Sequence, residues 1–182
     1  IGGASLAAFR SDYAVMGIMG LLIVMGGISY LVLHDVVTVR RLSRLGLDTK
    51  LILAGTAVLL LVGTALIFAT EYSRPGTLAD RSVGAKLVDS AFETAAGRTA
   101  GFSTFDWGKT TDHTNVGTEA LMFIGGASTS TAGGIKIGTF VVIVLTILTT
   151  VRGRRNIQVF GREIPAEVVR QAMVVGAVAS GA

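Results

Sequence analysis

The feature that most limits the fold of this chain is a run of twenty residues without a charged side chain, LILAGTAVLLLVGTALIFAT, at positions 51–70. A helix of about 20 apolar residues is long enough to cross the hydrocarbon core of a bilayer. A second long apolar stretch covers residues 13–37, only 15% of all residues are charged, and the mean hydropathy is +0.65. Soluble domains contain roughly a quarter of charged residues. The sequence therefore predicts a membrane protein.

Basic residues concentrate in two connecting segments, TVRRLSRLGLDTK at positions 38–50 and VRGRRNIQVFGRE at positions 151–163. Each segment flanks a membrane-length apolar run, so the positive-inside rule places both in the cytoplasm. The segment at 71–82, EYSRPGTLADRS, has two acidic and two basic residues, and we expect it outside. This placement explains the pI near 9.9 without a nucleic-acid partner, and we expect none.

A short segment between the apolar runs decides the topology. The stretch SVGAKLVDSAFETAAG predicts a helix over residues 83–97, with Ser82 as its N-cap and Gly97 as its stop. Fifteen helical residues reach only about 22 Å, which is less than the bilayer core of about 30 Å. The next long apolar segment, 116–151, must start outside to end in the cytoplasm. The short helix is therefore expected to be re-entrant, and irregular backbone at that depth has to line a cavity.

The residues that follow this helix, Thr99-Ala100-Gly101-Phe102, align with the T-V-G-Y of a potassium-channel filter. In such a filter, backbone carbonyls replace the hydration shell of the ion, here those of Thr99, Ala100 and Gly101. A glycine is needed where the backbone angles are closed to residues with a Cβ. An ordinary turn after an amphipathic helix is the alternative interpretation.

The stretch GGASTSTAGG at positions 125–134 interrupts the long apolar segment. Each glycine in a helix interior costs up to about 1 kcal/mol relative to alanine, so we expect a helix broken at membrane depth. Broken helices mark ion paths in transporters, and small residues should move at little cost. The candidate gate consists of Gly125, Gly126, Ala127, Ser128, Thr129, Ser130, Thr131, Ala132, Gly133, Gly134 and Lys136. The alternatives are a kink needed only for packing and, for the lysine, a snorkelling side chain.

Other motifs carry less. A phosphate-binding loop is rejected because Ile135 separates the last glycine of the stretch from Lys136. The two histidines, His34 and His113, lie far apart and do not indicate a metal site, and the chain has no cysteine. Neither a nucleophile–base pair nor a metal cluster is apparent, so we do not expect an enzyme.

Two further groups of residues have open interpretations. Asp106, Asp112 and Glu119 outnumber Lys109 near the expected outer mouth and could concentrate cations there, or each could lie in a solvated loop. Gly55 and Gly63 could let a neighbouring helix approach the apolar run closely, or could face lipid.

Three stretches together, AFETAAGRTAGFSTFDWG, ALMFIGGASTSTAGGIKIGTF and RGRRNIQVFGREI, resemble the third pore repeat of the Trk/Ktr superfamily of potassium transporters. The resemblance implies an all-α integral membrane protein built from repeats of membrane helix, re-entrant pore helix, filter and membrane helix, with a broken second helix. Residues 1–45 would end repeat two and include its last membrane helix. Residues 46–153 would form repeat three, with helix 51–70, pore helix 83–97, filter 98–103 and broken helix 116–151. Residues 154–182 would be a cytoplasmic loop and the start of repeat four, and the chain would be a fragment.

The same resemblance implies potassium uptake through a multi-pass pore subunit of the cell's inner (plasma) membrane, with sodium as a second candidate ion and no bound cofactor. The implied partners are a second copy in a homodimer, membrane lipid and a cytoplasmic nucleotide-binding regulatory ring at the basic loops. The sequence departs from the family near Thr129, where a proline often stands. An alternating-access cation symporter and a non-conducting accessory subunit remain as rivals.

Overall fold

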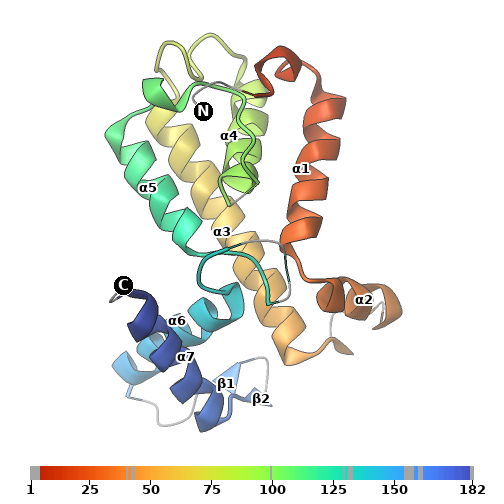
Figure 1. The fold of residues 1–182 in the computed structure, drawn as a ribbon, viewed down its shortest axis with the longest axis vertical. Coiled ribbons are helices and arrows are strands. Elements are labelled where there is room, and N and C mark those ends of the chain that lie inside the picture. The colour runs from red at the N-terminus through yellow and green to blue at the C-terminus, as the bar shows by residue number, and fades with distance from the viewer. Residues whose placement is uncertain are drawn as a thin grey trace.

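The computed structural model describes residues 5–39, 41, 44–98, 100–128, 130, 133–153, 158–159 and 162–180. Helices make up most of this part of the chain (Figure 1). The elements are η1 Ala7–Phe9, α1 Tyr13–Gly27, α2 Tyr30–Val39, α3 Leu47–Glu71, α4 Val83–Gly97, η3 Trp107–Lys109, α5 Asp112–Phe123, α6 Ile137–Val151, β1 Gln158–Val159, β2 Arg162–Glu163 and α7 Ala166–Ser180. The all-α fold class is confirmed, with β1 and β2 adding one short antiparallel hairpin that the sequence did not predict.

Helix α3 is the central element, and α1, α4 and α5 lie along its upper part (Figure 1). Within the described residues it is the single unbroken helix that is long and apolar enough to cross a membrane. It begins at Leu47, four residues before the expected start. The Asp35 carboxylate on α2 accepts hydrogen bonds from the Gly46 amide at 3.2 Å and the Thr49 hydroxyl at 2.6 Å, which secures this extra turn.

Two glycines on α3 sit where neighbouring helices come closest. A Cβ on Gly55 would lie 2.7 Å from the side chain of Val141 on α6. A Cβ on Gly63 would overlap Thr94 on α4 and lie 2.8 Å from Leu121 on α5. The close-approach interpretation therefore holds at both positions, and neither glycine is a lipid-facing one within this fold.

The apolar stretch at 13–37 does not form one continuous helix, so the expectation of a single unbroken membrane helix there is wrong, whereas its crossing of the membrane stays a prediction. Helix α1 ends at Gly27, α2 begins at Tyr30, and the two are bent by 100°. Gly26 and Gly27 have low helix propensity, and Ile28 is extended, with φ −90° and ψ 116°. The Ser29 hydroxyl accepts a hydrogen bond from the Leu31 amide at 3.2 Å and starts the new helix.

Helix α4 descends beside α3, and the chain then returns to the end from which it came (Figure 1). The Ser82 hydroxyl caps it by accepting from the Ala85 amide at 3.4 Å. At the top of α3, Glu71 accepts from the Thr111 amide at 2.8 Å, and Arg74 Nε donates to the Lys109 carbonyl at 2.6 Å. The residues before and after the α4 segment therefore meet at the same end of α3. The α4 segment begins and ends at that end of the helix.

The last long segment is divided into α5 and α6, with a loop between them. Helix α5 begins at Asp112, not near residue 116 as expected, because the Thr111 hydroxyl accepts from the Thr114 amide at 3.2 Å and caps the hydrophilic turn. Helix α6 is followed by the β1–β2 hairpin and by α7, which packs on α6. The register of the hairpin pairs Gln158 with Glu163 and Val159 with Arg162.

Candidate functional site

The candidate filter lies in the turn that ends α4. The Arg98 amide donates to the Ala95 carbonyl at 3.3 Å and the Ala100 amide to the Ala96 carbonyl at 3.0 Å, so the chain leaves the helix in a tight turn. Gly101 then has φ +76°. This left-handed backbone strongly favours glycine, and because a Cβ there would meet nothing within 4 Å, the requirement is one of conformation, not of space. Thr99, the first expected ligand, lies outside the described residues.

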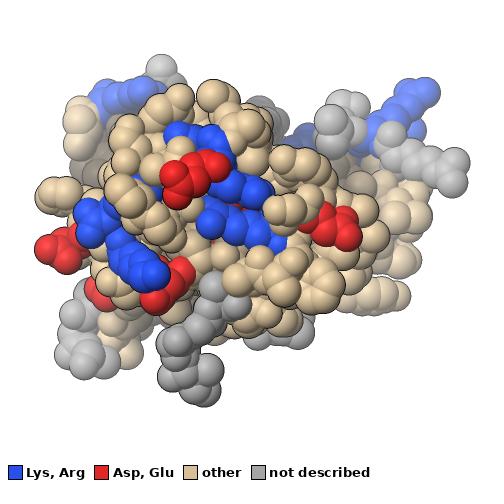
Figure 2. Space-filling view, turned by 90° about the horizontal axis from the view of Figure 1, so that it is seen from above, with Lys and Arg blue, Asp and Glu red and all other residues tan. Residues whose placement is uncertain are grey.

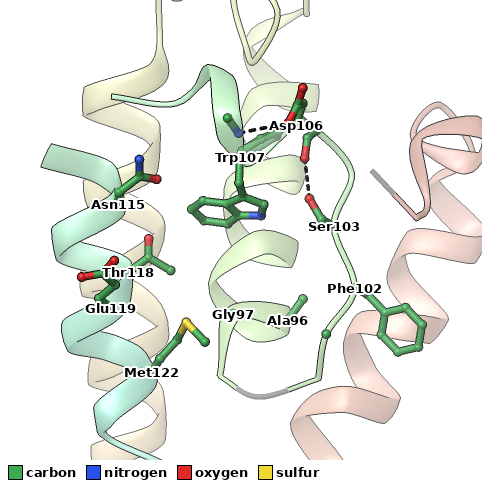
Figure 3. A pocket seen from close by; sticks show the side chains of 13 residues that line it. Ala96, Gly97, Phe102, Ser103, Asp106, Trp107, Asn115, Thr118, Glu119 and Met122 are labelled. Atoms are coloured by element: carbon green, nitrogen blue, oxygen red, sulfur yellow. Dashed lines mark hydrogen bonds between the residues drawn. The ribbon is translucent and has the colours of Figure 1, made fainter. Parts of the chain in front are cut away.

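A hollow of about 640 Å³ opens between the extended segment after α4 and helix α5 (Figure 3). Gly101, Trp107, Asn115 and Glu119 are among the residues that line it. The indole of Trp107 lies between the extended segment and α5, whereas the ring of Phe102 points away on the other side of that segment. Glu119 is exposed, so a carboxylate and the candidate filter glycine border the same open space.

Charges of both signs surround the end of the molecule at which α4 begins. Figure 2, seen from above, shows Lys and Arg side chains near the middle of this face with Asp and Glu around them. Asp106 and Asp112 are exposed, but so are Arg74 and Lys109. This face as a whole therefore does not have the expected excess of acidic residues. Glu119, which lines the hollow, is the acidic residue best placed to attract a cation there.

The candidate gate is a loop with a fixed base. Ile124 and Ile135 form a parallel bridge in which the Gly125 amide donates to the Ile135 carbonyl at 2.9 Å. The Ile137 amide donates to the Gly126 carbonyl at 3.1 Å. A Cβ on Gly125 would overlap the carbonyl oxygen of Gly133 across the base. Gly125, Gly126 and Ala127 are buried, so the expectation of weak packing is wrong for these three residues.

The remaining part of the candidate gate that the structure describes is more open. Ser128, Gly133 and Gly134 are exposed, and Ser130 and Lys136 are partly buried. Gly134 has φ +77°, which lets the chain turn back toward the base. Lys136 is the N-cap residue of α6. Thr129, Thr131 and Ala132 of the expected gate lie outside the described residues.

The base of this loop contacts both the candidate filter and the break between α1 and α2. Arg98 Nη2, in the turn that ends α4, donates to the Gly125 carbonyl at 3.2 Å. The Ala127 amide donates to the Gly27 carbonyl at 2.9 Å. The fold thus brings the filter turn, the interrupting loop and the end of α1 together, although they are far apart in sequence.

Sequence reasoning missed two carboxylates on α4, Asp89 and Glu93, both with 0% exposure. The available signal was their i, i+4 spacing, which places both carboxylates on one face of the helix together with Lys86 and several small or apolar residues. As for metals, no group of three or more His, Cys, Asp or Glu side chains gathers in the described part of the chain.

Comparison with known proteins places the chain. Residues 1–177 match the TrkH family, described as cation transport protein. The chain belongs to the TrkH family. The Ktr system potassium uptake protein B of Bacillus subtilis is 39% identical over 171 residues, which are 94% of this chain and 38% of that protein. The potassium/sodium uptake protein NtpJ of Enterococcus hirae is 31% identical over 172 residues, again 94% of this chain and 38% of that protein.

A solved structure agrees with the fold of this TrkH-family chain. The potassium transporter TrkH from Vibrio parahaemolyticus matches with a TM-score of 0.67 and 20% identity, covering 96% of this chain and 38% of that one. The chain therefore spans less than two fifths of the length of these relatives. The expected family, the membrane-transporter fold and the non-enzymatic class all agree with these matches.

Proposed function

We propose that this chain supplies one filter segment and one gating loop to a pore that takes up potassium across the cell's inner membrane. The observation that carries the proposal is Gly101, which has left-handed backbone at the end of a half-length helix and borders an open hollow. Backbone carbonyls of Thr99, Ala100 and Gly101 would coordinate the ion, as in carbonyl-lined filters. Sodium is the second candidate ion, since one relative is named a potassium/sodium uptake protein.

The loop of residues 125–134, with Lys136, would close the path beneath this filter. Its base is held by backbone hydrogen bonds and by Arg98, while Ser128, Gly133 and Gly134 are exposed. Opening would then move the exposed part of the loop and leave the base in place. Fewer packed contacts mean a lower cost of local displacement, which fits a gate better than a rigid packing kink.

Assembly follows from the resemblance to the family, and we propose it on that basis. A homodimer would have one pore in each protomer, surrounded by membrane lipid. A cytoplasmic nucleotide-binding ring would contact the basic loops, and the exposed side chains of Arg41, Arg44 and Arg152 support such a contact. Charged side chains of one sign at an exposed loop favour a partner of complementary charge.

Electrical recording tests the proposed function. The natural full-length protein would be reconstituted into planar bilayers with potassium on one side and sodium on the other, and protein-free bilayers would serve as the control. We expect unitary currents whose reversal potential is displaced far from zero in the direction that the potassium gradient sets. Currents that do not distinguish the two ions would contradict the filter.

The rival functions give different results in the same preparation. An alternating-access carrier would move potassium into vesicles without resolvable unitary currents, because each cycle moves only a few ions. A non-conducting accessory subunit would give neither current nor uptake. Either outcome would contradict the proposed pore.

A further inference from the structure

Helix α4 carries two fully buried carboxylates, Asp89 and Glu93, which lie one turn apart on the same face. A buried carboxylate is costly unless it is paired or hydrogen-bonded. The hydrogen-bond and ion-pair partners of these two carboxylates therefore show which segments they hold in place.

Glu93 holds the segment that leaves the candidate filter. Its Oε1 accepts hydrogen bonds from the amide of Thr104 and from the Thr104 hydroxyl, the latter at 2.7 Å. The Ser103 hydroxyl is 3.4 Å away and also lies 2.5 Å from the Phe105 carbonyl, so it donates mainly to that carbonyl. Thr104 is thus the main contact, and it lies two residues after Phe102, the last of the four candidate ion-binding residues.

Asp89 holds the same segment indirectly. Its Oδ2 lies 2.7 Å from Arg10 Nε and 3.4 Å from Arg81 Nε. Arg10 belongs to the stretch that precedes α1, and this stretch runs beside the exit of the filter. The Leu6 amide donates to the Ser103 carbonyl at 2.9 Å, and the Ser103 amide donates to the Ser5 hydroxyl at 3.2 Å. The ion pair between Arg10 and Asp89 therefore holds the segment before α1 against Ser103.

We propose that Glu93 directly, and Asp89 through Arg10, are positioning residues that hold the exit end of the filter segment and so set its preference for potassium over sodium. The proposal rests on the proposed role of residues 99–102 as a filter. Carbonyl-lined filters discriminate between ions by the placement of their oxygens. A segment anchored at Thr104 and Ser103 from behind cannot shift freely when an ion of another size enters.

The chain offers a matched control for the Glu93 contact. Glu71 on α3 is another fully buried carboxylate, and it accepts a hydrogen bond from the buried Thr77 hydroxyl at 2.9 Å. Glu71 ties the end of α3 to the loops around it and touches no residue of the filter exit that the structure describes. Thr104→Val and Thr77→Val each delete one buried hydroxyl that donates to a buried carboxylate. The Thr77 carbonyl, which accepts a hydrogen bond from Arg10 Nη2 at 2.5 Å, belongs to the backbone and is retained in Thr77→Val, so that variant leaves the contact with Arg10 in place.

The experiment measures initial rates of potassium and sodium uptake by the natural full-length protein in transport-deficient cells, normalised to inserted protein. We expect Thr104→Val to lower the potassium-to-sodium ratio about threefold, the effect of losing a hydrogen bond of ordinary strength. Thr104→Ser keeps the hydroxyl and should restore the ratio. Thr77→Val should lower only the amount of inserted protein.

A second variant, Arg10→Gln, removes the ion pair with Asp89. It tests the positioning role even if Thr104→Val fails to insert into the membrane. It should lower the same ratio and raise the KM for potassium more than it lowers the maximal rate, because it displaces ligands without blocking the path. Unchanged ratios in both Thr104→Val and Arg10→Gln, alongside a changed ratio in Gly101→Ser, would overturn the positioning role and leave the filter intact. Unchanged ratios in all three would contradict the filter itself.

Discussion

The backbone amide of Ala127 donates a hydrogen bond of 2.9 Å to the carbonyl oxygen of Gly27. This contact joins the loop that separates α5 from α6 to the break that separates α1 from α2. Two interruptions of helical structure, a hundred residues apart in the chain, therefore meet at one place. The carbonyl at the end of α1, which has no partner within its own helix, accepts its hydrogen bond from the loop.

A disulfide between these two positions should hold the loop in place. A single backbone hydrogen bond brings the two Cα atoms close together, and a disulfide also needs its Cβ atoms within about 3.5–4.5 Å of each other. A Cβ on Gly27 meets no other atom within 4 Å, so a cysteine there has room to turn toward residue 127. These 182 residues contain no cysteine, so Gly27→Cys with Ala127→Cys gives one pair within them, and any cysteine elsewhere in the full-length protein would first be replaced by serine. We expect oxidation to cross-link it and to remove most potassium uptake, and a reductant to restore that uptake. The two single variants are the controls, and full cross-linking with undiminished uptake would show that the loop is not a gate.

Close packing around Gly63 should make this position intolerant of any side chain. A Cβ there would overlap Thr94 and press on Leu121, and overpacking of this kind costs about 1–3 kcal/mol. We expect Gly63→Ala to lower the melting temperature of the purified protein in detergent. Gly17 on α1 has nothing within 4 Å of a Cβ, so Gly17→Ala should leave it unchanged or slightly higher. Equal melting temperatures for the two variants would mean that the helices do not approach closely at Gly63.

Membrane topology can be tested with single cysteines at three exposed arginines. We expect cysteines in place of Arg41 and Arg152 to react with an impermeant maleimide only from the cytoplasmic side, because basic loops face inward. A cysteine in place of Arg74, at the other end of α3, should react only from outside. Labelling of Arg41 and Arg152 positions from opposite sides would mean that α4 crosses the membrane, and the re-entrant topology would be wrong.

Local signals in the sequence explain how much of the fold could be predicted. Ser82 and Gly97 delimit α4, and the cluster of glycine and hydroxyl residues predicted the break between α5 and α6. The bend after Gly27 had a weaker signal in the sequence, a Gly-Gly pair followed by Ser29. The apolar residues on both sides made this stretch resemble one continuous membrane helix. The membrane depth of α4 and the assignment to pore repeats stay predictions.

Contacts between distant segments could not be predicted in the same way. The pairing of Arg10 with Asp89 spans 79 residues, and nothing in either local stretch specifies the other. Glu93 reads in sequence as a polar residue on a mixed helix, and only its 0% exposure and its bonds to Thr104 reveal a buried anchor. The candidate filter was found because backbone requirements are local, and Gly101 has the positive φ that such a motif needs.

The most direct test of the pore assignment compares serine substitutions at two glycines that share the same backbone geometry. Gly101 has φ +76° and Gly153 has φ +66°, and a Cβ at either position meets nothing within 4 Å. Each substitution therefore adds a similar strain, of about 1–2 kcal/mol for a left-handed L-residue. The measurement is the ratio of potassium to sodium uptake per inserted protein in transport-deficient cells. We predict that Gly101→Ser lowers this ratio about tenfold while Gly153→Ser leaves it unchanged; equal ratios in the two variants would contradict the filter.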